Sequence, residues 1–242
     1  MRYTHNFKVI RKRRHTAKIS LIITAILIFL IAFLGFTELD ARQFFFGFLQ
    51  SFLRVSIAYA ISLLLAFSLA LFVSSSKFVE DLTLPILDVM QSFPSFALFP
   101  LLLIWFGRTS LVTIIILVVA MIWPILFTLL SAQKQIKEDL TEAARSLGAS
   151  GWKYFIFVTI PLLFPSLITG SIVAWGEAWE TIIAAEIIVQ IPGVGTYLAK
   201  TGNVGNSQIL LIGIGLLLAL LFIFNKYIWL PLLNLSTKYQ QD

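Results

Sequence analysis

Long apolar runs constrain the fold of this chain more than any other feature of its sequence. Residues 44–74, 111–130 and 209–230 are each almost wholly apolar, and a helix needs ~20 such residues to cross a bilayer. Backbone polar groups in lipid must be bonded within the segment, which favours helices. Hydrophobic residues make up 59% of the 242 residues and charged residues only 12%. The sequence therefore predicts an all-α membrane protein rather than a soluble one.

Six transmembrane helices are predicted in this way. Their approximate ranges are 19–36, 44–74, 84–106, 111–130, 161–189 and 209–230. The third range contains Pro85, Pro94 and Pro100. Three prolines cannot all fit one straight helical hydrogen-bond ladder, so this span is expected to be kinked or broken. A glycine-rich loop, residues 192–206, is expected between the fifth and sixth spans.

Basic residues are distributed unequally about these spans. Residues 1–18 hold seven Lys or Arg and no acid, whereas Arg42, Arg108 and Lys200 are the basic residues expected on the opposite side. Such an excess marks the cytoplasmic side. We therefore expect a basic cytoplasmic tail (1–18), a six-helix membrane domain (19–233), a short cytoplasmic tail (234–242) and no nucleic-acid partner. The basic start is interpreted as preceding a retained span, not a cleaved signal peptide.

The longest hydrophilic stretch, residues 133–160, contains a short amphipathic helix around 140–147. Its apolar positions follow the spacing i, i+3, i+4, i+7. They are Leu140, Ala143, Ala144 and Leu147. Two alanines make this face nearly flat, and Gly148 is expected to end the helix with a positive φ. A linker helix lying on its own protein is one interpretation, and a docking helix is the other.

The wider spacing around this helix matches a known signature. Glu142-Ala143-Ala144 is followed after three residues by Gly148, and after nine more by Val158-Thr159-Ile160-Pro161. This pattern resembles the EAA signature of the inner-membrane permeases of binding-protein-dependent ABC importers. The usual Ile-x-Leu-Pro ending is Val-x-Ile-Pro here, which preserves its apolar character. The resemblance extends over about residues 53–233 and is closest to permeases of the nitrate, sulfonate and taurine group.

The resemblance implies a type I importer (MetI-like) architecture in the cytoplasmic (inner) membrane. The helix at 140–147 would be a coupling helix that docks on a separate ABC ATPase. Further partners would be a second permease copy or a paralogue, and an extracytoplasmic solute-binding protein. The substrate would be a small oxyanion, a sulfonate or a vitamin-precursor-like compound. The residues expected to act in coupling are Glu142, Ala143, Ala144, Arg145, Leu147, Gly148 and Pro161.

Polar residues within spans are the candidates for a translocation path, because a charge in a bilayer costs at least ~2.5–3.5 kcal/mol. They are Arg54, Gln91, Ser92, Glu177, Glu180 and Glu186. Alternatives remain for each of them. Arg54 could snorkel to the interface, Glu186 could lie at the interface, and Gln91 and Ser92 could mark only a packing kink.

Glu177 and Glu180 are spaced i, i+3 and share a helix face, whereas Glu186 lies about half a turn round from Glu177. One straight helix cannot direct all three glutamates into one cavity. Glu177 and Glu180 are expected in a cavity or a subunit seam, or in a structural pair with Arg54. Two uncompensated carboxylates would repel an anionic substrate.

Catalytic and metal-binding functions find little support in the sequence. There is no cysteine, both histidines (His5 and His15) lie in the basic tail, and no P-loop is found. We therefore expect a non-catalytic subunit without cofactor or metal, with ATP bound by a partner. The main alternative is a stand-alone secondary carrier or channel that uses the intramembrane glutamates. The scaffold of a vitamin-type importer lacks support, because its paired Ala-Arg-Gly motifs are absent, and an intramembrane enzyme is least favoured.

Overall fold

The computed structural model describes residues 40–136, 138–205 and 207–236. Every regular element within these ranges is helical. In chain order they are α2 (Ala41–Val73), α3 (Lys77–Gln91), η1 (Ser95–Leu98), α4 (Phe99–Phe106), α5 (Ser110–Lys134), α6 (Glu138–Ser146), α7 (Trp152–Tyr154), η2 (Phe155–Thr159), α8 (Ile160–Val189), α9 (Val194–Asn203), α10 (Ser207–Phe224), η3 (Asn225–Trp229) and α11 (Leu230–Ser236). The all-α prediction is confirmed.

The described residues contain four helical segments that are long and apolar enough to cross a membrane. They are Ala41–Val73, Ser110–Lys134, Trp152–Val189 and Ser207–Ser236. The pair Lys77–Gln91 and Ser95–Phe106 adds a fifth span if the two count as one. The predicted first span (19–36), the basic tail (1–18) and residues 237–242 lie outside the described part of the chain.

The third span is broken, as its prolines predicted. Its two halves meet at an angle of 78°, and the break falls where α3 ends at Gln91, just before Pro94. The first half begins at Lys77, earlier than the predicted residue 84. The reason is the side chain of Ser76, whose hydroxyl accepts a hydrogen bond from the N–H of Val79 (3.3 Å) and caps the helix.

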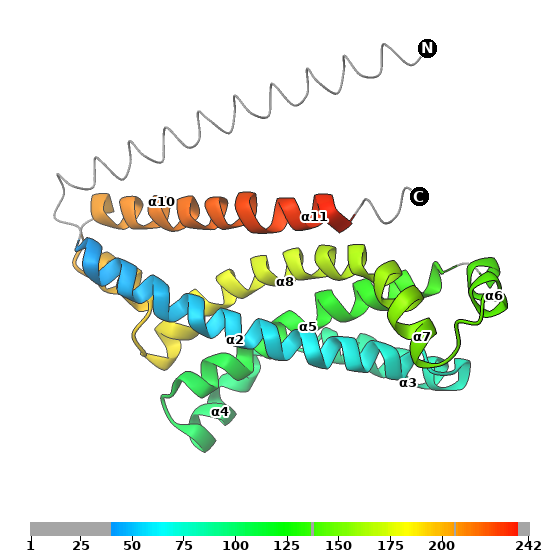
Figure 1. Cartoon of the computed structure of the whole chain (residues 1–242). Helices are drawn as coiled ribbons and strands as arrows, with labels where there is room; N and C mark the ends of the chain where they lie inside the picture. Colours follow the sequence, from blue (N-terminus) through cyan, green and yellow to red (C-terminus); the bar gives the residue numbers. More distant parts are fainter. Residues whose placement is uncertain (1–39, 137, 206, 237–242) are drawn as a thin grey trace, which may run out of the picture.

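Helices α2, α5 and α8 form the centre of the bundle, with α5 packed against both of the others (Figure 1). On α2, small side chains recur every four residues and are fully or almost fully buried: Ala58, Ser62, Ala66 and Ala70. Small residues at this spacing let helix backbones approach closely within a membrane. Residues 41–73 form one continuous helix that begins right after the capping residue Asp40.

Gly170 brings α8 close to α5. A methyl group at this position would lie 2.9 Å from the carbonyl oxygen of Pro124 and 3.0 Å from Cα of Ile125. Gly170→Ala should therefore lower the free energy of unfolding by about 1–3 kcal/mol, because the backbones must separate. Gly176→Ala, on the same helix with nothing within 4 Å, is the matched control. Thermal unfolding of the two purified variants checks this, and equal stabilities would contradict it.

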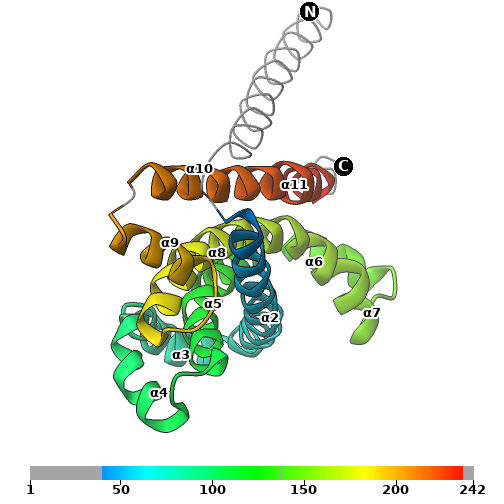
Figure 2. The same ribbon diagram turned by 90° about the vertical axis from the view of Figure 1, so that its left-hand side faces the viewer.

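Residues 192–206 were predicted to form a loop, but they contain helix α9. The helix was not predicted because the glycines of this stretch are typical of a loop. Its residues Val194, Tyr197 and Leu198 are buried and pack with the start of α2 and the end of α8 (Figure 2). Tyr197 meets Phe44 edge to face, with ring centroids 5.6 Å apart. Burial raises the pKa of the Tyr197 phenol above its usual value. Packing of α9 against α2 and α8 therefore stabilises a helix that the local sequence favours only weakly.

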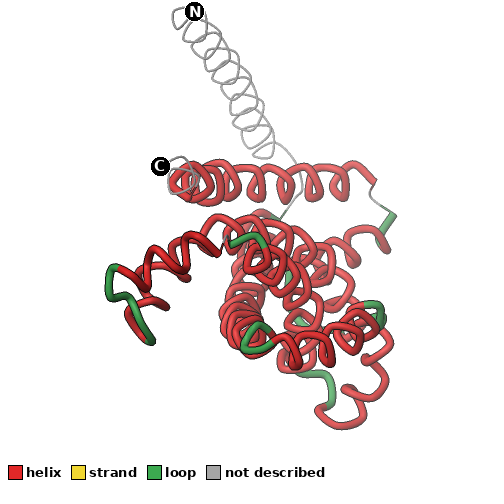
Figure 3. The backbone as a smooth tube through the Cα atoms, turned by 90° about the vertical axis from the view of Figure 1, so that its right-hand side faces the viewer, coloured by secondary structure: helices red, strands yellow, loops and turns green. Residues whose placement is uncertain are grey.

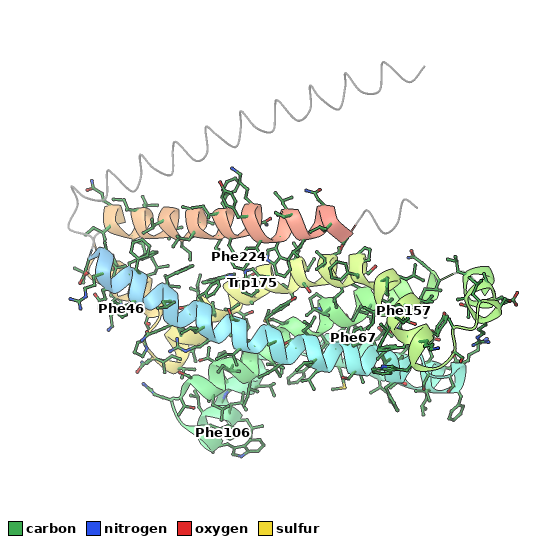
Figure 4. All side chains as sticks on the ribbon, in the orientation of Figure 1. Phe46, Phe67, Phe106, Phe157, Trp175 and Phe224 are labelled. Carbon is green, nitrogen blue, oxygen red and sulfur yellow. The ribbon has the colours of Figure 1, made fainter. Side chains whose placement is uncertain are left out.

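An aromatic cluster attaches the last span to the bundle. Trp175 of α8 stacks on Phe224 of α10 with centroids 4.7 Å apart and planes inclined by 5° (Figure 4). Phe52 of α2 meets both rings edge to face. Each such aromatic pair contributes about 0.5–1.5 kcal/mol in addition to the stabilisation from the apolar area that it buries. The cluster therefore holds α2, α8 and α10 together at one level of the bundle.

Candidate functional site

Helix α6 ends in a Schellman motif at the predicted glycine. Gly148 has φ of 85°, its N–H donates to the carbonyl of Arg145 (2.9 Å), and the N–H of Ala149 donates to the carbonyl of Ala144 (3.0 Å). These are the two hydrogen bonds that define the motif. The prediction that Gly148 ends the helix with a positive φ is confirmed.

The apolar stripe of α6 is largely exposed among the described residues. Leu147 is 89% exposed and Leu140 48% exposed, while Ala143 is exposed and Ala144 is half-buried. The α6–α7 region projects from the bundle (Figure 2 and, from the opposite end, Figure 3). Helix α6 contacts α7 through the hydroxyls of Thr141 and Tyr154, 3.0 Å apart, and most of the stripe remains free to receive another surface.

A continuous helical segment leads from this region into the bundle. It runs from Trp152 to Val189 and includes the π-helical turn η2, where the N–H of Ile160 donates to the carbonyl of Phe155. Pro161 follows at the first turn of α8. Proline has no N–H and collides with the carbonyl four residues earlier in an ordinary helix, so a wider turn just before it accommodates the ring. The helical segment starts at Trp152, before Pro161, whereas the sequence had predicted that the span starts at Pro161.

A hollow of about 640 Å³ lies between the broken span, α5 and α8. It brings together three of the predicted path residues: Gln91 from the end of α3, and Glu177 and Glu180 from α8. Ser92 follows Gln91 in the chain, but its hydroxyl donates to the carbonyl of Asp88 (3.1 Å). Aromatic side chains supply much of the remaining wall: Phe93, Phe96, Trp123 and Phe127. The hollow thus combines aromatic walls with two carboxylates on its α8 side.

The other two predicted path residues, Arg54 and Glu186, lie elsewhere and bind each other. A guanidinium nitrogen of Arg54 is 2.7 Å from Oε1 of Glu186, which is fully buried. Arg54 also donates to the carbonyl of Pro192 (2.7 Å) and to Ser110 Oγ (3.2 Å). Arg54 and Glu186 are thus paired inside the protein, and Arg54 is the structural partner of Glu186 rather than of Glu177 or Glu180.

Sequence reasoning missed the rest of this buried cluster. Ser51 donates to Oε1 of Glu186 (2.7 Å) and accepts from the N–H of Val194 (2.9 Å), while the N–H of Gly195 donates to Oε2 (2.9 Å). A methyl group at Gly193 would overlap the Glu186 carboxylate. We call Ser51, Arg54, Glu186 and residues 192–195 the clamp, because they tie α2 and α8 to the start of α9. The only feature of the sequence that could have indicated this cluster is the i, i+3 spacing of Ser51 and Arg54, which places them on one helix face.

Comparison with known proteins adds a family and several relatives. The family model described as "Binding-protein-dependent transport system inner membrane component" matches residues 58–228. This range covers α6 and the hollow, but not Ser51 and Arg54.

The taurine transport system permease protein TauC of Escherichia coli is 28% identical over 173 residues, 72% of this chain and 63% of the relative. The nitrate import permease protein NrtB of Synechococcus elongatus is 30% identical, over 67% of this chain and 60% of the relative. The putative aliphatic sulfonates transport permease protein SsuC of Escherichia coli is 34% identical, over 53% and 48%. In each case the match spans less than two thirds of the relative's own length.

Proposed function

The chain belongs to the family of binding-protein-dependent transport system inner membrane components, and from this we propose that it is the membrane-spanning subunit of an ATP-driven importer. It would move a small solute across the cytoplasmic membrane. ATP would be hydrolysed by a separate ATPase subunit, and an extracytoplasmic binding protein would deliver the solute. The permease names of the relatives, for taurine, nitrate and sulfonates, support this class of function.

The observation that carries the proposal is the largely exposed apolar stripe of α6. Leu147 is 89% exposed and Leu140 about half exposed, and burying a leucine contributes about 1.5–3 kcal/mol. The alanines between them let a partner approach the backbone closely. Glu142 and Arg145, both exposed, flank the stripe and suit polar contacts at its rim. A groove on the ATPase is the surface we expect to receive this face.

The hollow supports a path that a second subunit completes. Glu177 and Glu180 are exposed in the single chain, and a carboxylate that faces lipid is costly. A second permease copy or a paralogue placed against α3, α5 and α8 would remove both side chains from lipid. The hollow would then become part of a path between two subunits. The end of the bundle that carries α6 would face the cytoplasm, in line with the basic excess predicted for that side.

Affinity purification of the tagged full-length chain from its native membranes in mild detergent tests the proposal. We expect a P-loop ATPase to co-purify in near-stoichiometric amount. A chain that purifies alone and transports solute into liposomes without ATP would contradict the importer proposal. It would instead support the alternative of a secondary carrier, which the glutamates in the hollow favour.

A further inference from the structure

The hollow carries negative charge without a compensating cation. Glu177 and Glu180 lie one helical turn apart on its α8 wall, and none of its lining residues is Lys or Arg. Among the described residues, neither carboxylate takes part in an ion pair, since the two ion pairs found are Arg54–Glu186 and Lys134–Glu80. A solute that enters the hollow therefore meets two carboxylates directly.

Arg54 cannot neutralise these carboxylates. Its guanidinium is held in the clamp by Glu186, Ser110 and the carbonyl of Pro192. Swinging it into the hollow would leave Glu186 buried as an unpaired charge, which costs about 3–5 kcal/mol. The electrostatic character of the hollow is thus fixed by Glu177 and Glu180.

The aromatic walls of the hollow also favour a cationic or flat aromatic solute. Trp123 and Phe127 of α5 and Phe93 and Phe96 around η1 line the same space. A cation placed over an aromatic face within ~6 Å gains about 0.5–2 kcal/mol, most with tryptophan. The flat body of an organic molecule can stack on the same rings. Aromatic walls next to carboxylates therefore suit an organic cation.

Thr181 supplies an independent sign of a ligand. It is only 6% exposed, yet it lines the hollow, and its hydroxyl makes no hydrogen bond to any other residue in the part of the chain that the structure describes. By contrast, Thr169 on the same helix donates to the carbonyl four residues earlier (3.0 Å). The Thr181 hydroxyl is not among the fully buried polar atoms that lack a partner, so it remains accessible from the hollow. A polar group of a bound solute would satisfy it.

We propose that the hollow binds an organic cation, a protonated amine attached to a flat apolar body, and that this is the substrate class of the importer. The ammonium group lies between Glu177 and Glu180, the body stacks on Trp123 and Phe127, and Thr181 bonds a polar group on the solute. The volume of about 640 Å³ is in the range of small-molecule sites. This inference rests on the proposed function and departs from the anions in the names of two relatives, nitrate and aliphatic sulfonates.

Calorimetric titration of the purified full-length chain in lipid nanodiscs, at pH 7, tests the charge preference. The probes are benzylammonium, benzyl alcohol and benzoate, which share a ring and differ in charge. We expect benzylammonium to bind at least tenfold more tightly than either of the others. Benzoate binding as tightly as benzylammonium would overturn the proposal, and so would a chain that binds none of the three.

Variants locate the binding in the hollow. Glu177→Gln and Glu180→Gln should each weaken benzylammonium binding about tenfold and leave benzyl alcohol unaffected. Asp81→Asn, in the first turns of α3 and outside the hollow, is the matched control and should bind as the wild type does. Unchanged affinity in the double glutamine variant would overturn the proposal.

The result can be separated from the fate of the importer proposal, because the titration needs no ATPase. If the ATPase co-purifies but benzylammonium does not bind, the substrate class is wrong and the importer stands. If benzylammonium binds and no ATPase is found, the hollow remains a cation site and the importer proposal fails.

Discussion

Replacing Glu186 with glutamine should lower the free energy of unfolding by about 3–5 kcal/mol. The change removes the charge that compensates Arg54, which stays 11% exposed with its guanidinium inside the protein. Breaking a buried ion pair on one side leaves an uncompensated charge, and this accounts for the size of the effect. Thermal and denaturant unfolding of the detergent-purified variant, compared with the wild type, measure it.

The double variant Arg54→Met/Glu186→Leu separates the charge from the packing. Because it removes both charges, it should be more stable than either single variant, with strong non-additivity. Glu177→Gln, on the same helix but exposed, is the matched control and should change stability by less than about 0.5 kcal/mol. Single-variant losses that simply add in the double variant would show that the ion pair is not what matters in the clamp.

Ala144→Asp and Gly148→Val should each abolish ATP-coupled uptake while the chain still inserts into the membrane. Aspartate at 144 places a charge within the apolar stripe of α6. Valine at 148 must adopt φ near 85°, which a β-branched residue strongly disfavours, so the end of the helix is remodelled. The measurements are uptake of the transported solute and the amount of ATPase that co-purifies, both at equal membrane abundance.

Ser146→Asp is the matched control for this pair, since it adds the same charge to α6 away from the stripe. It should retain most of the uptake and of the bound ATPase. Wild-type uptake in either Ala144→Asp or Gly148→Val, at normal expression, would refute the role of α6 in coupling. If uptake is lost while the ATPase still co-purifies, the variant docks on the ATPase but fails to transmit the ATPase's movement to the membrane helices.

Hydropathy predicted the spans because the requirement is simple: a long apolar helix satisfies its own backbone. The prolines of the third span predicted that it is broken, because each proline removes a helical hydrogen bond, but Pro85 lies inside α3 and only Pro94 stands at the break. Helix α9 escaped prediction for the opposite reason. Val194, Tyr197 and Leu198 form a short apolar face that is stable only against α2 and α8, while the surrounding glycines indicate a loop.

In the candidate site, too, the local sequence predicted some features, and others depend on tertiary packing. Helical periodicity separated Glu186 from Glu177 and Glu180, and the structure agrees, since Glu186 lies in the clamp and the other two line the hollow. The partner of Arg54 could not be predicted from the sequence, because Arg54 and Glu186 are 132 residues apart in the chain. Only the packing of α2 against α8 and α9 brings them within bonding distance.

The unbroken helix from Trp152 to Val189 has 38 residues, about 57 Å at the usual rise per residue. One end adjoins α6 and the other holds Glu186 in the clamp. If α6 docks on an ATPase as proposed, a tilt imposed on this segment at its α6 end would be transmitted toward its α9 end. The π-helical turn at Phe155–Thr159 interrupts the regular hydrogen-bond pattern of this segment, so under the proposed function the tilt that reaches α9 would depend on the stiffness of that turn.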